Sequence, residues 1–332
     1  MLFKRFESEG LSHYSYIVGD GTVAAVIDPR RDCDVYLDEA SKNGLKITHI
    51  FETHRNEDYV TGSPELAAAT GAEIFTADAQ LNIRHGRPVK DGEEFMIGRL
   101  KIKAIHTPGH TPGHMSYLLH DTEGIPWILF SGDSLFAGDV GRTDFLGADM
   151  LEEMTGEMYD TIFERILPLG DHIILCPAHG PGFVCGAAIS EREWTTIGIE
   201  RMNNPRLQFS DREAFIMSGK MLERSPYFRK MEELNVEGPD ILGGVPFVNS
   251  VSPGEFEKMI CDGGVVLDTR SEVEYGSGHI PGAVYVPDFA ISVYAGWWLS
   301  YDKPVLLVAD ADKIEDVTRR LVRIGYDNIA AV

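Results

Sequence analysis

The sequence predicts a protein of two α/β domains, a larger one over residues 1–236 and a smaller one over 247–332. In both parts, short apolar runs rich in β-branched residues alternate with helical segments, which is the rhythm of layered α/β folds. The chain of 332 residues also exceeds the roughly 100–200 residues usual for one domain. Between the two parts, EGPDILGGVP at 237–246 brings Gly and Pro residues close together, which indicates a linker.

The composition excludes several classes of protein. Hydrophobic residues make up 43% of the chain and charged residues 25%, as in globular proteins. The formal net charge of −22 disfavours nucleic-acid binding, because an acidic surface repels phosphate backbones. No run approaches the roughly 18–20 apolar residues that span a membrane, and the N-terminus lacks a secretory signal. Four cysteines without a CxxC pair argue against a disulfide framework, so we expect a cytoplasmic protein.

Each expected element of the larger domain has a local reason. A Gly-Asp-Gly turn between two β runs predicts a hairpin at 14–28. Gly44 ends a helix at 34–43, and the apolar run at 45–52 reads as a buried strand. The next elements are a helix at 64–70, a strand at 72–76, consecutive strands between 94 and 133, an amphipathic helix at 149–167 and a strand at 171–175.

Capping boxes mark helix starts on both sides of the linker. Ser190 with Glu193 predicts a helix that continues to about Met202, and Ser252 with Glu255 opens a helix in the smaller domain. The remaining elements are a helical stretch at 211–234, strands at 265–270 and 304–310, and a last helix with an apolar stripe of Ile314, Val317, Leu321 and Ile324.

Four loops of the larger domain each follow a strand-like run and carry a side chain that can bind metal. They are THRNEDYVTG at 53–62 with His54, HTPGHTPGHMSY at 106–117 with His110, SGDSLFAGDVGRTDF at 131–145 with Asp133, and CPAHGPG at 176–182 with His179. Proline and glycine fix the backbone on both sides of the second histidine. Two histidines and one carboxylate without a thiolate suit iron, zinc or manganese. The sequence therefore predicts a metal site.

These loops resemble the metal motifs of the metallo-β-lactamase superfamily, whose fold is an αββα sandwich, and the resemblance covers roughly residues 1–235. The first loop of that superfamily reads His-x-His-x-Asp-His. Here His54 and Asp58 keep the pattern, whereas Asn56 and Tyr59 replace two histidines. The run GDSLFAGDVGRTDF is typical of the persulfide dioxygenases, and so is a tail of Asn204-Pro205, Pro226-Tyr227-Phe228, Met231 and Asn235.

The resemblance implies an Fe(II) enzyme. A dinuclear hydrolase needs both metal positions, and the two replacements remove a ligand from each. His54, His110 and Asp133 remain as the two-histidine, one-carboxylate triad of non-heme iron oxygenases. The implied cofactor is one Fe(2+) per chain, with zinc as the alternative. The implied reaction is oxidation by O2 of a small thiol persulfide, such as glutathione persulfide, to sulfite and the free thiol, in sulfide and persulfide detoxification.

The same resemblance suggests roles for the neighbouring residues. Asn56, Asp58, Tyr59 and His179 are expected to surround the metal ligands, although Tyr59 is equally expected as a core aromatic residue. Arg142, with Asp144, is expected to bind the anionic substrate, and the alternative is a structural ion pair between the two. Cys185 offers a thiol that could accept sulfur, with burial as its alternative. His106 and His114 are expected to be structural.

The smaller domain resembles a rhodanese domain through VVLDTR at 265–270 and GHIPGA at 278–283. A rhodanese carries sulfur on a cysteine after the strand that here reads PVLLV, yet the loop at 309–313 is ADADK. We therefore expect a catalytically inactive domain with a docking, interface or cleft-shaping role. The chain ends soon after Tyr326, earlier than a complete rhodanese fold, which is expected of a fragment of a longer protein with a downstream rhodanese domain.

Two other functions stay open at this point. One is a glyoxalase-II-like thioester hydrolase that uses zinc, and the other is a non-catalytic binding or regulatory protein with a degenerate metal site. The expected partners are the persulfide and O2, a second copy of the chain in a homo-oligomer, and a sulfurtransferase or downstream rhodanese domain. Neither nucleic acid nor a membrane is expected as a partner.

Overall fold

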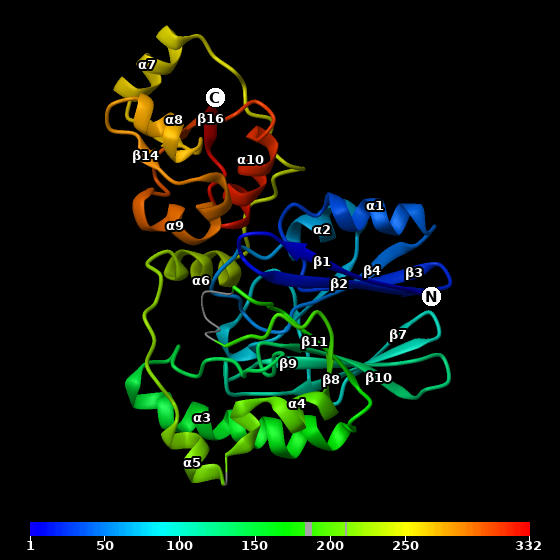
Figure 1. Ribbon diagram of the computed structural model, residues 1–332. Coiled ribbons are helices and arrows are strands. Elements are labelled where there is room, and N and C mark those ends of the chain that lie inside the picture. Colours follow the sequence, from blue (N-terminus) through cyan, green and yellow to red (C-terminus); the bar gives the residue numbers. More distant parts are fainter. Residues whose placement is uncertain (183–187, 210) are drawn as a thin grey trace.

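The computed structural model describes residues 1–182, 188–209 and 211–332. Two six-stranded sheets make up the larger domain (Figure 1). The first sheet contains, in spatial order, β1 (Leu2–Ser8), β2 (His13–Asp20), β3 (Val23–Ile27), β4 (Lys46–Phe51), β5 (Glu73–Thr76) and β6 (Arg87–Pro88). The second contains β12 (Thr195–Thr196), β11 (Ile174–Pro177), β10 (Pro126–Gly132), β9 (Met115–His120), β8 (Leu100–His106) and β7 (Glu94–Ile97).

Helices cover the outer face of each sheet, and the two inner faces pack against each other. The helices α1 (Asp34–Lys42) and α2 (Ser63–Thr70) lie on the first sheet, and α3 (Leu151–Asp160), α4 (Ile197–Asn203) and α5 (Arg212–Met217) lie on the second. Between the sheets, buried aromatic side chains such as Phe51, Phe75 and Tyr117 form the core. The predicted αββα sandwich is therefore confirmed.

The strand directions bring the four loops to one edge of the sandwich. Strand β3 runs parallel to β4 in the first sheet, and β10 runs parallel to β11 in the second. His54 follows β4 of the first sheet, and Asp133 and His179 follow the neighbouring strands β10 and β11 of the second, so each side chain leaves the carboxyl end of a strand. His110 lies in the turn between the antiparallel strands β8 and β9.

Two predicted helices differ from the structure. The helix expected from Ser190 begins at Ile197, because Thr195 and Thr196 pair with β11 as a short strand instead. Thr196 then provides the cap, and its side chain accepts a hydrogen bond from the Ile199 N–H. The stretch expected at 211–234 is divided into α5 and α6 (Phe228–Glu237), with neither helix nor strand between them.

The smaller domain has a four-stranded parallel sheet of order β14-β13-β15-β16. Its strands are β13 (Val265–Asp268), β14 (Val284–Tyr285), β15 (Val305–Val308) and β16 (Ile329–Ala331), and its helices are α7 (Pro253–Cys261), α8 (Glu272–Ser277), α9 (Ile291–Trp298) and α10 (Ile314–Arg323). The capping box of Ser252 and Glu255 is confirmed at the start of α7. Within the described ranges, no helix is long and apolar enough to cross a membrane.

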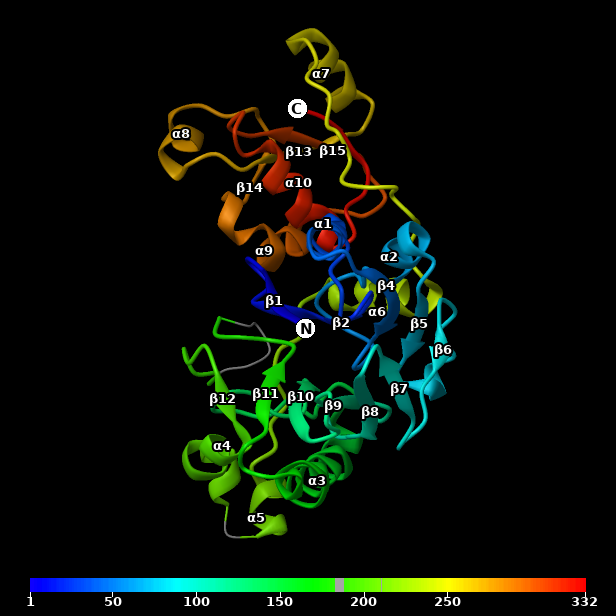
Figure 2. The ribbon, with the colours of Figure 1, turned by 90° about the vertical axis from the view of Figure 1, so that its right-hand side faces the viewer.

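The two domains share one hydrophobic core. Its members include Tyr59 and Met231 of the larger domain and Ile291 and Leu321 of the smaller one. Figure 1 shows α6 directly below α9 of the second domain, and Figure 2 shows α6 behind the strands of the first sheet. The edge of the sandwich that carries the four loops is thus covered by α6 and by the second domain.

Candidate metal centre

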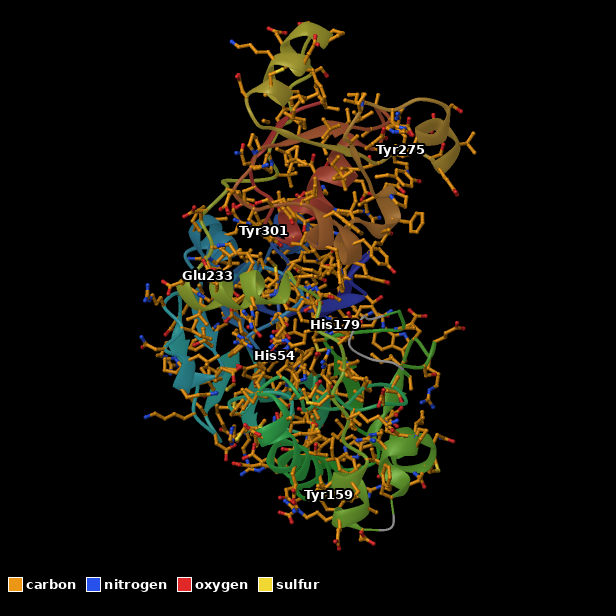
Figure 3. The ribbon with its side chains drawn as sticks, turned by 90° about the vertical axis from the view of Figure 1, so that its left-hand side faces the viewer. His54, Tyr159, His179, Glu233, Tyr275 and Tyr301 are labelled. Carbon is orange, nitrogen blue, oxygen red and sulfur yellow. The ribbon has the colours of Figure 1, made fainter. Side chains whose placement is uncertain are left out.

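Three predicted ligands converge at the covered edge of the sandwich. One side-chain atom from each of His54, His110 and Asp133 lies within 4.8 Å of the other two, and all three residues are buried. Figure 3 shows His54 and His179 in the middle of the molecule, below the helix that carries Glu233. The three atoms belong to three loops, and each loop is held in place by a different strand. A rigid fold presents a metal site in this way.

His110 is oriented by the backbone of the GRTDF segment. Its Nδ1–H donates to the Arg142 carbonyl at 2.9 Å, so the lone pair of Nε2 is available on the other side of the ring. Nε2 is buried and makes no hydrogen bond to any described residue. A buried nitrogen without a hydrogen bond costs folding free energy unless another interaction, such as metal coordination, satisfies it. A metal ion would satisfy this atom, so the residues fit the cofactor that the donor set suggests.

His54 is held by a short relay that starts at the end of β3. Its Nδ1 lies 2.9 Å from the Thr53 hydroxyl, and that hydroxyl donates to Asp28 at 2.9 Å. Asp28 also accepts from the Thr53 N–H at 2.8 Å. Burial lowers the pKa of His54, which favours the neutral imidazole that a metal needs. No sequence pattern marks Asp28, because its partner Thr53 is 25 residues away.

Asp133 is fixed from two sides by histidines. His114 Nε2 accepts a hydrogen bond from the Asp133 N–H at 3.0 Å, and its Nδ1 lies 2.8 Å from the Thr107 hydroxyl. His179 Nδ1 donates to Asp133 Oδ1 at 2.9 Å, which leaves Oδ2 facing His54 and His110. His114 was expected to be structural, and its hydrogen bond positions the backbone of a ligand.

His179 is clamped between two carboxylates. In addition to Asp133, its Nε2 lies 3.1 Å from Asp58 Oδ2. Burial alone would lower the pKa of His179, but the carboxylates of Asp133 and Asp58 raise it to about 10. This raised pKa favours the doubly protonated imidazole at neutral pH, in which both ring nitrogens donate to carboxylates. A protonated imidazole thus lies where the superfamily pattern would place ligands of a second metal.

The two substituted positions of the first loop lie beside this cluster. Asn56 donates to the His54 carbonyl at 3.4 Å, and its Oδ1 is buried without a hydrogen bond to the described residues. Tyr59 is fully buried, and its ring lies 4.0 Å from the ring of His13 in the core shared with the second domain. Burial raises the pKa of the Tyr59 hydroxyl well above its usual value, so the hydroxyl stays protonated.

Asn235 of α6 holds the loop that carries these residues. Its amide Nδ2 donates to the carbonyls of Asn56 and Tyr59, both at 2.8 Å. Its Oδ1 accepts from the Thr61 N–H at 2.9 Å. All three contacts are buried, so α6 determines the path of the loop between the first metal ligand and α2. The sequence marked Asn235 only through the tail pattern.

Glu57 is a residue of the site that the sequence analysis missed. Its Oε2 lies 3.5 Å from His110 Nε2 and 3.9 Å from His54 Nε2. Burial raises the pKa of Glu57, but the neighbouring His110, Arg55 and His54 lower it to about 2. Glu57 follows Asn56 at a position that the superfamily pattern leaves unspecified, so only the abundance of acidic residues in the loop signalled it.

Arg142 forms a buried ion pair with Asp144. Two nitrogens of the guanidinium donate to the two oxygens of that carboxylate, at 2.6 and 2.7 Å. Arg142 also lines a surface cavity of about 400 Å³ whose basic side chains include Arg206 and Lys220. Gly141 lines this cavity and also packs against the backbone of Asp133, because a Cβ there would be 1.8 Å from the Asp133 carbonyl oxygen. Binding of an anionic substrate by Arg142 and Asp144 stays a prediction.

Cys185 lies outside the described residues, so its role as a thiol also stays a prediction. Of the other cysteines, Cys33 and Cys176 are buried and Cys261 is exposed on α7. Burial raises the pKa of the Cys33 thiol to about 12, which makes this thiol unreactive.

The comparisons with known proteins agree with this geometry. The family model of the Metallo-beta-lactamase superfamily matches residues 9–179, just over half of the chain, and includes His54, His110, Asp133 and His179. The chain belongs to the metallo-beta-lactamase superfamily. A second family model, Rhodanese-like domain, matches residues 252–332. The chain therefore joins a metallo-beta-lactamase domain to a rhodanese-like domain, as the sequence predicted.

Several members of the superfamily are similar over long stretches. A metallo-beta-lactamase from Staphylococcus aureus subsp. aureus COL is 31% identical with a TM-score of 0.89, over 99% of this chain and 98% of that one. The structure of ETHE1 from Myxococcus xanthus is 30% identical with a TM-score of 0.59, over 71% of this chain and 96% of that one.

Relatives of both candidate activities are found by sequence. The mitochondrial persulfide dioxygenase ETHE1 of Bos taurus is 26% identical over 246 residues, 72% of this chain and 83% of the relative. A hydroxyacylglutathione hydrolase of Rhodospirillum rubrum is 37% identical over 147 residues, 43% of this chain and 53% of the relative. The predicted resemblance to persulfide dioxygenases is confirmed, and the superfamily membership indicates a metal-binding enzyme.

Proposed function

We propose that the protein is an Fe(II)-dependent persulfide dioxygenase. The proposed reaction is R–S–SH + O2 + H2O → R–SH + SO3²⁻ + 2 H⁺, where R–SH is a small thiol such as glutathione. The terminal sulfur is oxidised, O2 is reduced, and the S–S bond breaks with a proton left on the thiol. The proposal is supported by the similarity to the persulfide dioxygenase ETHE1 of Bos taurus, which aligns with 72% of this chain.

The observation that carries the proposal is the clamp on His179. A two-metal hydrolase would need Asp58 and His179 as ligands of the second ion, and both would have to face it. Here His179 donates to Asp58 and Asp133 instead, and the pKa of about 10 favours this protonated state at neutral pH. The arrangement therefore supports one metal ion per chain, as in two-histidine, one-carboxylate iron oxygenases.

His54, His110 and Asp133 would hold the iron, which when bound supplies open positions for O2 activation. The protein orients the three ligand side chains and keeps bulk water away from them. The Arg142 carbonyl keeps the proton of His110 on Nδ1, and His179 keeps one oxygen of Asp133 occupied so that the other faces the histidines. The buried surroundings of all three ligands exclude bulk water from the site.

The substrate is proposed to be anionic at neutral pH, as glutathione persulfide is. The cavity beside Gly141 is lined by three basic residues, Arg142, Arg206 and Lys220, and by one acidic residue, Asp139, on a chain whose net charge is −22. Arg206 makes no ion pair with a described carboxylate, and its guanidinium lies over Phe209 and Phe215. A carboxylate of the substrate would find complementary charge there.

A zinc thioester hydrolase is the second candidate, because hydroxyacylglutathione hydrolases are among the sequence relatives. Anaerobically purified protein, loaded separately with Fe(II) and with Zn(II), would be assayed in parallel with glutathione persulfide and with S-lactoylglutathione. We expect persulfide-dependent O2 uptake with equimolar sulfite from the iron form, and no such uptake from Asp133→Ala. Thioester cleavage by the zinc form without persulfide oxidation by the iron form would overturn the proposal.

A further inference from the structure

The carboxylate of Glu57 lies as far from the nitrogens of His54 and His110 as the carboxylate of Asp133 does. Glu57 Oε2 lies 3.5 Å from His110 Nε2 and 3.9 Å from His54 Nε2. Asp133 Oδ2 lies 3.5 Å and 3.9 Å from the same two nitrogens. Two carboxylate oxygens from different loops therefore stand at equal distances from both imidazoles.

These separations do not match hydrogen bonds. Hydrogen bonds between nitrogen and a carboxylate oxygen are about 2.7–3.2 Å long, and His110 Nε2 makes none to the described residues. Ligand atoms at about 2.0–2.2 Å from a common ion lie roughly 3.0–3.5 Å apart when adjacent. The spacing between Glu57 and the histidines is thus close to that of ligands around one ion.

The other oxygen of Glu57 is already occupied. Arg55 donates to Glu57 Oε1 at 3.0 Å and to Glu232 of α6 at 3.0 Å, and Arg224 in turn pairs with Glu232. Arg55 therefore fixes the carboxyl group from behind, and Oε2 is left directed at the imidazoles. A buried glutamate has several competing rotamers, and this chain of ion pairs selects the one that faces the site.

We propose that Glu57 is a fourth protein ligand of the metal in the substrate-free protein. Glu57 would then add a second carboxylate to the three residues whose ligand atoms lie within 4.8 Å of one another, His54, His110 and Asp133. Arg55 and Glu232 act as positioning residues for the fourth ligand. The inference rests on the metal site and not on the reaction, so it holds for zinc as well as for iron.

The test measures metal binding without turnover. Zinc affinity would be determined by competition with a chromophoric chelator for the wild type, Glu57→Ala and Glu57→Gln. Loss of an orienting partner of a ligand weakens metal binding about 10–100-fold, so we expect at least a tenfold loss in Glu57→Ala. The visible spectrum of the Co(II)-substituted protein should also change in Glu57→Ala, because the number of protein ligands falls.

Glu65→Gln is the matched control, since Glu65 is a buried glutamate of α2 that accepts from the Leu242 N–H and contacts no metal ligand in the hydrogen bonds of the described residues. Its zinc affinity and Co(II) spectrum should equal those of the wild type. Wild-type affinity and an unchanged spectrum in both Glu57 variants would overturn the proposal, and so would an equal loss in Glu65→Gln. An enzyme inactive towards persulfide would contradict the proposed function and leave this test intact.

Discussion

At the scale of single residues, the proposal of one metal ion per chain rests on His179. Its imidazole joins Asp133, a metal ligand, to Asp58, a ligand position of the superfamily pattern. Two buried carboxylates so close together repel each other unless a cation lies between them. The imidazole of His179 lies between the two carboxylates here, and its raised pKa favours the protonated form that stabilises both.

Removing His179 should therefore destabilise the protein. In His179→Ala two buried carboxylates lose their shared cation, and breaking a buried ion pair costs about 3–5 kcal/mol of unfolding free energy. Urea unfolding of the metal-free protein measures this loss. His172→Ala, an exposed histidine before β11, is the control and should stay within about 0.5 kcal/mol of the wild type. A His179→Ala variant as stable as the control would contradict the clamp.

The sequence predicted the three metal ligands because each follows a strand and precedes a glycine-rich or polar turn. Glu57 and Asp28 escaped prediction for physical reasons. The direction of the Glu57 side chain depends on Arg55 and on Glu232, which lies 177 residues from Arg55. Asp28 acts through Thr53, and nothing near Asp28 in the sequence reveals this contact.

At the scale of elements, a buried polar pair connects the end of β4 to the segment before β6. Glu52, at the end of β4, accepts from Thr61 at 2.8 Å and lies 2.9 Å from His85 in the segment before β6. Burial alone would lower the pKa of His85, but Glu52 raises it above 6.5. This pair connects the first metal loop to the segment between β5 and β6.

The His85–Glu52 pair should contribute stability that depends on pH. Because the folded pKa of His85 is raised, its contribution is complete below about pH 6.5 and is lost as the pH rises through the raised value. His85→Gln should lose about 3–5 kcal/mol at about pH 6 and less at about pH 9. Urea unfolding at both pH values, with a double-mutant cycle through Glu52→Gln, checks this. A loss independent of pH would contradict the ion pair.

Helix boundaries show where local sequence signals fail. The capping box at Ser190 has the right residues, yet the chain there pairs Thr195 with Leu175 in the second sheet. Tertiary pairing of two β-branched residues outweighs a local cap, which is worth only about 1 kcal/mol. The cap at Ser252 has no competing strand, so this helix start was predicted correctly.

At the scale of the whole molecule, α10 joins the rhodanese-like domain to the metallo-beta-lactamase domain. Arg323 donates to both oxygens of Asp32, at 2.9 and 2.7 Å, and its carbonyl accepts from the Val60 N–H at 2.8 Å. Arg319 pairs with Asp32 and Asp34. The second domain thus contacts the backbone of the loop that carries His54, a contact that sequence patterns within either domain could not reveal.

The shared core and these ion pairs predict that the two domains unfold together. Breaking a buried ion pair costs about 3–5 kcal/mol of unfolding free energy. The loss in Arg323→Ala should lie at the lower end of this range, because Arg319 and Arg30 still face Asp32. Arg229→Ala, exposed on α6, is the control. Calorimetry should show one transition in the wild type, shifted to lower temperature in Arg323→Ala. Two separate transitions in the wild type would contradict a common core.

The central claim, that this site binds one metal ion per chain, is tested most directly by metal stoichiometry. Metal-free protein would be saturated anaerobically with Fe(II), and in parallel with Zn(II), freed of excess metal and analysed for bound ions per chain. The clamp of His179 between Asp58 and Asp133 predicts one ion in both cases. Two tightly bound ions per chain would contradict it.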